Sequence, residues 1–193
     1  MRGHFLTGAG GAALLLLAAS AATVRANDNQ QMSGQALADM EVRPRAAPPP
    51  REQIAYTGSY PAGTIVVSTE ERRLYYILPG NQAIKYGIGV GRPGFEWGGT
   101  KRVSMKRIWP SWRPPIEMLR RRPDLPHFLP GGPDNPLGAR AMYLGRTLYR
   151  IHGSNEPQTI GQAVSSGCIR MTNEDIEDLY ERVRVGTRVV VLR

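Results

Sequence analysis

The chain contains one cysteine, Cys168, which lies in the motif SSGCIRM. A thiolate is a strong nucleophile when a nearby base or positive charge favours it. Gly167 allows the backbone to turn tightly before the sulfur, and Ser165 and Ser166 add polar groups that a buried structural cysteine does not require. Cys168 is therefore a candidate nucleophile. The alternatives are an inert buried thiol and a thiol that pairs with a second molecule.

A candidate base for this thiol is His152, one of three histidines in the chain. His152 ends an expected strand over 147–152, and 15 residues separate it from Cys168. Strand ends and helix starts often meet at one rim of a sheet, so the imidazole could take the proton from the sulfur. An ordinary histidine, satisfied by structural hydrogen bonds, is the other interpretation of this residue.

A short helix is expected directly after Cys168. Thr172 and Asp175 form a capping box at its start, and Gly186 is a plausible stop. A thiol just before a helix start is close to the positive end of the helix dipole, and Arg170 would add to this effect. We therefore expect an ionised cysteine here. The apolar residues that fall on one helical face are Ile176, Leu179, Tyr180 and Val183.

Other chemistries find little support in the sequence. One cysteine and two histidines beyond the first residues, without a tight carboxylate cluster, make a weak set for zinc, and no metal or cofactor is expected. The chain has no G-x-S-x-G motif for a serine nucleophile. The glycines of 87–91 are not followed by the helix that a phosphate-binding loop requires.

The N-terminus predicts export. Met1, Arg2 and His4 precede an apolar stretch over 9–22, and a small-residue cleavage site ends at Ala26. We therefore expect a cleaved signal peptide over 1–26, with an uncleaved membrane anchor as the alternative. The segment 27–59 is poor in large apolar residues and rich in proline, which predicts a disordered tether.

The 193 residues and the formal net charge of +9 limit the classes of protein further. A chain of this length buries one core, so one domain is expected over 60–193. A basic chain often binds nucleic acid, but export argues against that partner. An anionic envelope polymer or membrane surface is the expected partner, and a well-solvated surface is the alternative.

The strand signals indicate a mostly β domain. Two β-branched or aromatic runs, 64–69 and 74–78, predict a hairpin, and 85–91 continues the pattern. The last strand is expected over 185–192. Proline and glycine crowd 92–138, which predicts long loops without regular elements. The three tryptophans of this segment, expected as packing anchors, are Trp97, Trp109 and Trp112.

The segment IHGSNEPQTIGQAVSSGCIRM resembles the signature of the L,D-transpeptidase catalytic domain (YkuD-like) family. In that family an H-G motif is followed about 15 residues later by S-x-G-C-[IV]-R-[ML]. The segments WPSWRPP (109–115) and GPDNPLG (132–138) are similar to the Gram-negative envelope type. The resemblance covers residues 62–193 and implies a β-sandwich with a cradle-like groove, one or two short helices and long loops.

The resemblance also implies roles for individual residues. Cys168 matches the nucleophile, His152 the base, and Gly153 the residue whose carbonyl orients the imidazole. The backbone N–H groups of Gly167 and Cys168 would form the oxyanion hole. The residues that would bind substrate or support the site are Ser154, Asn155, Ser165, Ser166 and Arg170.

The implied reaction is acyl transfer on peptidoglycan stem peptides in the periplasm. The thiolate attacks the carbonyl of diaminopimelate, the third stem residue, and D-alanine leaves. A second stem, an outer-membrane protein or lipoprotein, or water then resolves the thioester, and carbapenems would acylate the same thiol. A non-catalytic peptidoglycan-binding module is the rival interpretation.

The sequence departs from the family pattern at two places. Ser166 replaces a histidine of many family members. The segment WGGTK (97–101) replaces a T-P-x-G turn, and this second difference bears on the choice of acceptor.

Overall fold

The computed structural model describes residues 47–193. The expected signal peptide and residues 27–46 of the expected tether lie outside the described residues. The described part contains strands β1 (Glu52–Ala55), β2 (Ile65–Ser68), β3 (Arg73–Leu78), β4 (Gln82–Gly87), β5 (Val90–Gly91), β6 (Gly99–Ile108), β7 (Arg140–Leu144), β8 (Arg150–His152), β9 (Ala163–Ser165), β10 (Ile169–Arg170) and β11 (Arg188–Leu192). Its helices are α2 (Ile116–Arg121), the 3-10 helix η1 (Pro157–Thr159) and α3 (Asn173–Arg182).

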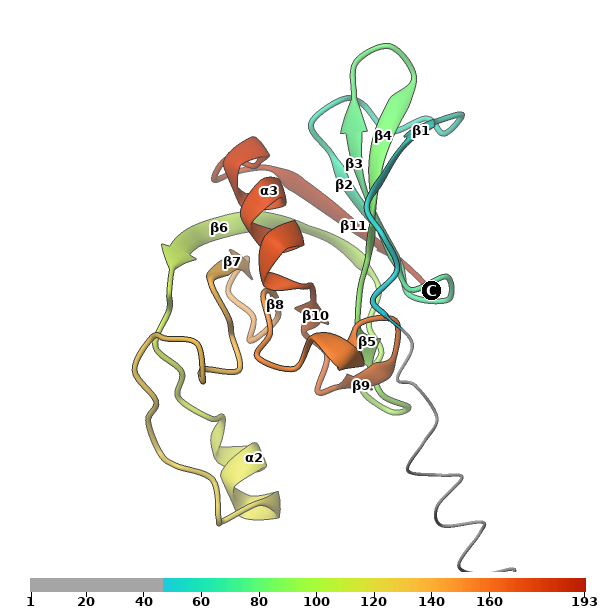
Figure 1. The fold of residues 1–193 in the computed structure, drawn as a ribbon. Helices are drawn as coiled ribbons and strands as arrows, with labels where there is room; N and C mark the ends of the chain where they lie inside the picture. Colours follow the sequence, from blue (N-terminus) through green and yellow to red (C-terminus); the bar gives the residue numbers. More distant parts are fainter. Residues whose placement is uncertain (1–46) are drawn as a thin grey trace, which may run out of the picture. The chain divides into compact units, whose positions relative to one another are not determined.

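The strands form a curled sheet of nine, in the order β1-β4-β3-β2-β11-β6-β7-β8-β10, while β5 and β9 form a separate pair. The long strand β6 belongs to both halves of the large sheet: its first residues pair with β11 and its last with β7. The register shifts between Val103 and Met105, where the partner changes. Figure 1 shows β6 as one curved strand that joins the two halves. The mostly β fold expected from the sequence is confirmed.

The central strands of the sheet are buried on both faces. The predicted hairpin is confirmed, because β2 pairs with β3 in antiparallel register. Strand β11 lies on the other side of β2 and runs parallel to it. Residues 65–67 of β2 and 189–191 of β11 are all buried, which explains why both strands read as continuous β-branched runs rather than alternating ones.

Order begins earlier than the sequence indicated. Strand β1 lies inside the segment expected as a tether, and it forms one edge of the large sheet by pairing with β4. Ile54, Tyr56 and Tyr60 pack against a small buried cluster of Val66, Ile77 and Ala83 on the outer face of the sheet. The expected domain start at residue 60 is therefore too late. The proline-rich composition predicts disorder, but these three side chains bury apolar surface against the sheet.

The expectation of loops without regular elements over 92–138 is also wrong. Strand β6 covers ten residues of this segment, and α2 adds a short helix with no buried residue. The strand was not visible in the sequence because charged residues occupy several of its positions. One of them, Lys106, is half-buried and donates to the carbonyls of Tyr180 and Val183 at 2.5 and 2.6 Å.

The predicted helix after Cys168 is confirmed as α3. Thr172 is its N-cap and accepts a hydrogen bond from the backbone N–H of Asp175 at 3.1 Å. The apolar face is buried at Ile176 and Leu179 and packs into the main core. Within residues 47–193, no helix is long and apolar enough to cross a membrane.

Candidate active site

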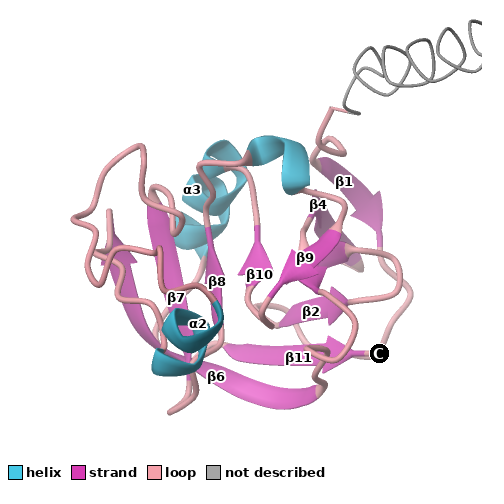
Figure 2. Cartoon of the chain, turned by 90° about the horizontal axis from the view of Figure 1, so that it is seen from below, coloured by secondary structure: helices cyan, strands magenta, loops and turns pink. Residues whose placement is uncertain are grey.

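Strands β8 and β10 bring the cysteine and histidine segments together. They are parallel neighbours, with Ile169 opposite Ile151 and Arg170 opposite His152. Figure 2 shows the two strands side by side in the middle of the molecule. Cys168 directly precedes β10 and is therefore level with Arg150 on β8. Because side chains alternate along a strand, Arg150 and His152 lie on one face, and Arg170 shares it.

His152 is held as a neutral imidazole of one tautomer. Its side chain is buried, and Nδ1 lies 2.6 Å from the carbonyl oxygen of Gly153. A carbonyl only accepts, so Nδ1 carries the proton and Nε2 keeps a free lone pair. Burial, followed by the charge of Arg170, lowers the pKa of His152 to about 3, against the opposite effect of the Gly153 hydrogen bond.

Cys168 is a partly buried free thiol. Its Sγ donates to the carbonyl of Leu148 at 3.7 Å. Burial raises the pKa of Cys168, while the guanidinium groups of Arg150 and Arg170 act to lower it. The expectation that the helix start ionises this thiol is wrong: β10 separates Cys168 from α3, and the dipole effect fades within the first turn.

The loop before the sulfur is held by Ser165. Its hydroxyl accepts from the backbone N–H of Gly167 at 3.1 Å and donates to the carbonyl of Cys168 at 2.6 Å. Gly167 has a φ of +101°, a conformation that favours glycine. The Gly167 N–H, expected in the oxyanion hole, is thus already bound to a protein partner in this structure.

Two aromatic side chains that the sequence did not assign to the site pack against this loop. Trp97 donates its indole N–H to the carbonyl of Gly167 at 2.6 Å. Its ring stacks on Tyr149 at 4.4 Å between centroids and 3° between planes. A Cβ at position 167 would lie 2.6 Å from Tyr149 Cε1. Trp97 is therefore a packing anchor, as expected, and it also fixes the backbone next to Cys168.

Asn173, the first residue of α3, holds the loop after His152. Its Oδ1 accepts from the backbone N–H groups of Ala139 and Ser154 at 2.9 and 3.3 Å. A Cβ at position 153 would lie 2.3 Å from the same oxygen, so Gly153 is required by close approach. No spacing in the sequence indicated this role for Asn173.

Arg170 and Ser154 bind other protein groups. Arg170 forms an ion pair with Glu156 at 3.0 Å, and its backbone N–H and carbonyl both pair with Gly89 at 2.9 Å. The hydroxyl of the buried Ser154 accepts from the Glu156 N–H at 3.0 Å. These contacts connect β10 to the loop that follows His152.

Ser166 and Asn155 also contact neighbouring loops. Ser166 accepts from the Arg92 guanidinium at 3.2 Å, and Arg92 in turn lies over the ring of Phe95 at 4.2 Å. Asn155 donates to the carbonyl of Asp134 at 3.0 Å, which joins the histidine loop to the GPDNPLG segment. All five supporting residues expected from the sequence therefore lie around the two strands.

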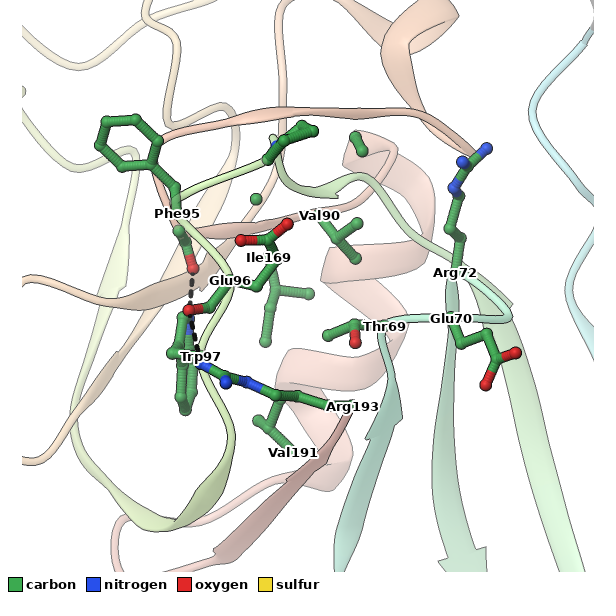
Figure 3. A pocket seen from close by; sticks show the side chains of 14 residues that line it. Thr69, Glu70, Arg72, Val90, Phe95, Glu96, Trp97, Ile169, Val191 and Arg193 are labelled. Carbon is green, nitrogen blue, oxygen red and sulfur yellow. Dashed lines mark hydrogen bonds between the residues drawn. The ribbon is translucent and has the colours of Figure 1, made fainter.

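A cavity of about 350 Å³ lies against the cysteine loop. Its apolar side chains include Val90, Phe95, Trp97, Ile169 and Val191, and its charged side chains are Glu70, Arg72, Glu96 and Arg193. Figure 3 shows the Arg193 guanidinium reaching the Glu96 backbone, where it donates to the carbonyl at 2.9 Å. Cys168 is not among the lining residues. Over residues 47–193, no group of three or more histidine, cysteine and acidic residues is arranged to hold a metal ion.

Comparison with known proteins identifies related chains. The family model "L,D-transpeptidase catalytic domain" (YkuD) matches residues 62–191. The probable L,D-transpeptidase ErfK/SrfK of Escherichia coli K12 is 44% identical over 137 residues, which are 66% of this chain and 43% of the relative. The probable L,D-transpeptidase YbiS of the same strain is 45% identical over 134 residues, 65% of this chain and 43% of the relative. The match thus spans less than half of each relative.

Solved structures share the fold. A Brucella melitensis protein named a probable carnitine operon oxidoreductase CaiA is 44% identical, with a TM-score of 0.51 over 79% of this chain and 97% of that one. An L,D-transpeptidase from Mycobacterium smegmatis is 18% identical, with a TM-score of 0.55 over 67% and 58% of the two chains. An Enterococcus faecium catalytic domain acylated by ertapenem is 23% identical, with a TM-score of 0.53 over 70% and 100%.

Proposed function

The chain belongs to the L,D-transpeptidase catalytic domain family, and from this premise we propose that it is a peptidoglycan L,D-transpeptidase. Cys168 is the proposed nucleophile and His152 the proposed general base. The observation that carries this proposal is the parallel pairing of β8 with β10, together with the 2.6 Å contact between His152 Nδ1 and Gly153 O. That contact leaves Nε2 free to accept a proton.

The first half of the proposed reaction acylates the cysteine. The thiol proton passes to His152 Nε2, and the sulfur attacks the diaminopimelate carbonyl of a tetrapeptide stem. The tetrahedral intermediate collapses when the bond to D-alanine breaks, and the leaving amine takes the proton back from His152. A thioester on Cys168 and free D-alanine are the products.

We assign the oxyanion of this intermediate to the backbone N–H groups of Gly167 and Cys168. Gly167 then has to exchange the Ser165 hydroxyl, its present partner at 3.1 Å, for the substrate oxygen. Trp97 supports this geometry, since its bond to the Gly167 carbonyl fixes the same peptide segment from the other side.

The second half of the reaction transfers the acyl group to an acceptor. The amine of a second diaminopimelate gives a 3-to-3 cross-link, and a lysine or N-terminus of an outer-membrane protein or lipoprotein gives an anchored protein. Water gives trimming, which is the L,D-carboxypeptidase alternative. The proposed location is the periplasm, reached through the signal peptide, where the basic surface suits an anionic cell-wall polymer.

Products of the purified protein with disaccharide tetrapeptides test this function. Mass spectrometry should detect released D-alanine with the wild type and none with Cys168→Ala. A protein that binds the stems and releases no D-alanine would be the non-catalytic module. Products of the wild type then separate the acceptors: cross-linked dimers indicate transpeptidation, and tripeptides alone indicate carboxypeptidase activity.

A further inference from the structure

Arg150 is a charged residue next to the sulfur that the motif and the proposed reaction do not use. It is level with Cys168 on the neighbouring strand. Its Nη1 donates to the carbonyl of Leu148 at 3.2 Å, and the Cys168 Sγ donates to the same carbonyl at 3.7 Å. The guanidinium also lies over the ring of Tyr143 at 5.0 Å. These contacts hold the positive charge near the thiol.

The Arg150 side chain has an unused donor in this position. Its Nε is buried and has no hydrogen-bond partner within residues 47–193. A buried donor without an acceptor costs roughly 1–3 kcal/mol, so such groups normally find a partner. In the proposed reaction, the sulfur of Cys168 loses its proton and becomes a strong hydrogen-bond acceptor beside Arg150.

The other ionisable side chains around the sulfur are either neutral or already bound to a protein partner. Arg170 faces the same site, but it forms an ion pair with Glu156 at 3.0 Å. Arg92 donates to the hydroxyl of Ser166, two residues before Cys168. His152 is uncharged, since burial and Arg170 hold its pKa far below neutrality. Arg150 forms no ion pair within the described part of the chain.

We infer that the Arg150 guanidinium is the counter-charge of the Cys168 thiolate. This inference rests on the proposed function, in which that thiolate is the nucleophile. When the proton moves from sulfur to His152 Nε2, the electron pair that stays on sulfur faces Arg150. The same guanidinium disfavours an imidazolium at His152, so a resting thiolate–imidazolium pair does not form.

Electrostatic effects on both residues agree with this role. Burial raises the pKa of Cys168, and the charge and hydrogen bonds of Arg150 act in the opposite direction. Arg150 also contributes to the lowered pKa of His152, after burial and Arg170. One cation thus makes the thiol more acidic and the imidazole less basic. Arg150 is a positioning residue that acts through the sulfur.

The test is the pH dependence of Cys168 alkylation in purified protein. The rate with iodoacetamide is measured from pH 5 to 10 for wild type, Arg150→Met, Arg150→Gln, Arg150→Lys and the control Arg146→Met. Arg146 is exposed on the loop between β7 and β8, four residues before Arg150. Both neutral variants should move the midpoint up by about one pKa unit, which slows alkylation about tenfold below the midpoint. Lysine should restore at least half of the shift, and Arg146→Met should leave the midpoint unchanged.

The outcomes separate this inference from the proposed function. Alkylation requires no turnover, so a shifted midpoint without D-alanine release would leave the inference intact and contradict the function. An unchanged midpoint in either folded neutral variant, with D-alanine release retained in wild type, would overturn the inference alone. A raised KM with an unchanged midpoint would assign Arg150 to a substrate carboxylate instead. Circular dichroism shows which variants are folded, and either neutral variant is sufficient.

Discussion

Trp97 donates its indole N–H to the carbonyl oxygen of Gly167 at 2.6 Å, although the two residues are 70 positions apart in the chain. The loop after β5 thereby fixes the peptide unit next to the proposed nucleophile. Trp97 also stacks on Tyr149, which precedes β8, so one indole contacts both segments that lead into the site.

Replacing Trp97 by phenylalanine removes this hydrogen bond and keeps an aromatic ring against Tyr149. The free energy of unfolding should fall by about 1 kcal/mol. D-alanine release should slow by about tenfold, because the loop that carries the sulfur loses a fixed contact. The control is Trp112→Phe, since the cross-strand bonds of Trp112 to Leu129 use backbone atoms only. Equal turnover in both variants would contradict this role for Trp97.

Gly167→Ala should destabilise the fold through two effects. Its φ of +101° strains any other residue, and the new Cβ would lie 2.6 Å from Tyr149 Cε1. Gly186→Ala is the matched control, because its φ is +94° and nothing lies within 4 Å of the added atom. Urea unfolding should show a loss of about 1–3 kcal/mol for Gly186→Ala and a further 1–3 kcal/mol or so for Gly167→Ala. Equal losses of unfolding free energy in the two variants would mean that the Tyr149 ring moves away from the added methyl group without a cost in stability.

His152 makes stability depend on pH. Its pKa falls from 6.5 in the unfolded chain to about 3 in the fold, so the unfolded state binds the proton first as pH decreases. The contribution of His152 to the free energy of unfolding is present above pH 6.5 and is lost as pH falls from 6.5 towards 3. Between pH 6.5 and 5 the free energy of unfolding should fall by about 1.6 kcal/mol from this effect.

The measurement for this prediction is the free energy of unfolding in urea at both pH values. His152→Gln should lack this part of the pH slope, while His127→Gln, at an exposed loop position, should keep it. Parallel pH curves for wild type and His152→Gln would show that His152 is protonated in the fold as readily as in the unfolded chain.

Lys106 stabilises the end of α3 from strand β6. Its ammonium donates to the Tyr180 and Val183 carbonyls at 2.5 and 2.6 Å and lies over the Tyr180 ring at 3.9 Å. Lys106→Met should lower the free energy of unfolding by about 1.5–3 kcal/mol, since charged hydrogen bonds to helix carbonyls are lost. Arg107→Met, at the next and exposed position, should change stability by less than about 0.5 kcal/mol. Similar losses of unfolding free energy in Lys106→Met and Arg107→Met would show that the Lys106 ammonium does not stabilise the end of α3.

The chemistry-bearing residues could be predicted because they are close in sequence. The H-G and S-x-G-C segments contain their own signals, and the strand and helix periodicities around them locate Cys168 and His152 at neighbouring element ends. The contact between His152 and Gly153 joins adjacent residues, so the resemblance was sufficient to suggest it. The prediction that the helix start ionises Cys168 was wrong because the two residues of β10 lie between Cys168 and α3.

The rest of the site depends on contacts between distant segments. Trp97 contributes one hydrogen bond to a backbone atom and Asn173 contributes two, and no local pattern encodes such partners. Strand β6 was missed for a related reason. Its charged side chains suggest a loop, whereas Lys106 finds its hydrogen-bond partners on α3, more than 70 residues away.

The central claim is that Cys168 forms a covalent bond with the diaminopimelate carbonyl after His152 removes its proton. Intact-protein mass spectrometry of the enzyme mixed with tetrapeptide stems, or with a carbapenem as a slowly resolved substitute, measures this bond directly. We predict an adduct on the peptide that contains Cys168 in wild type, none in Cys168→Ala and a strongly slowed adduct in His152→Ala. A wild-type protein that stays unmodified while binding the stems, or an adduct that persists in Cys168→Ala, would contradict the account.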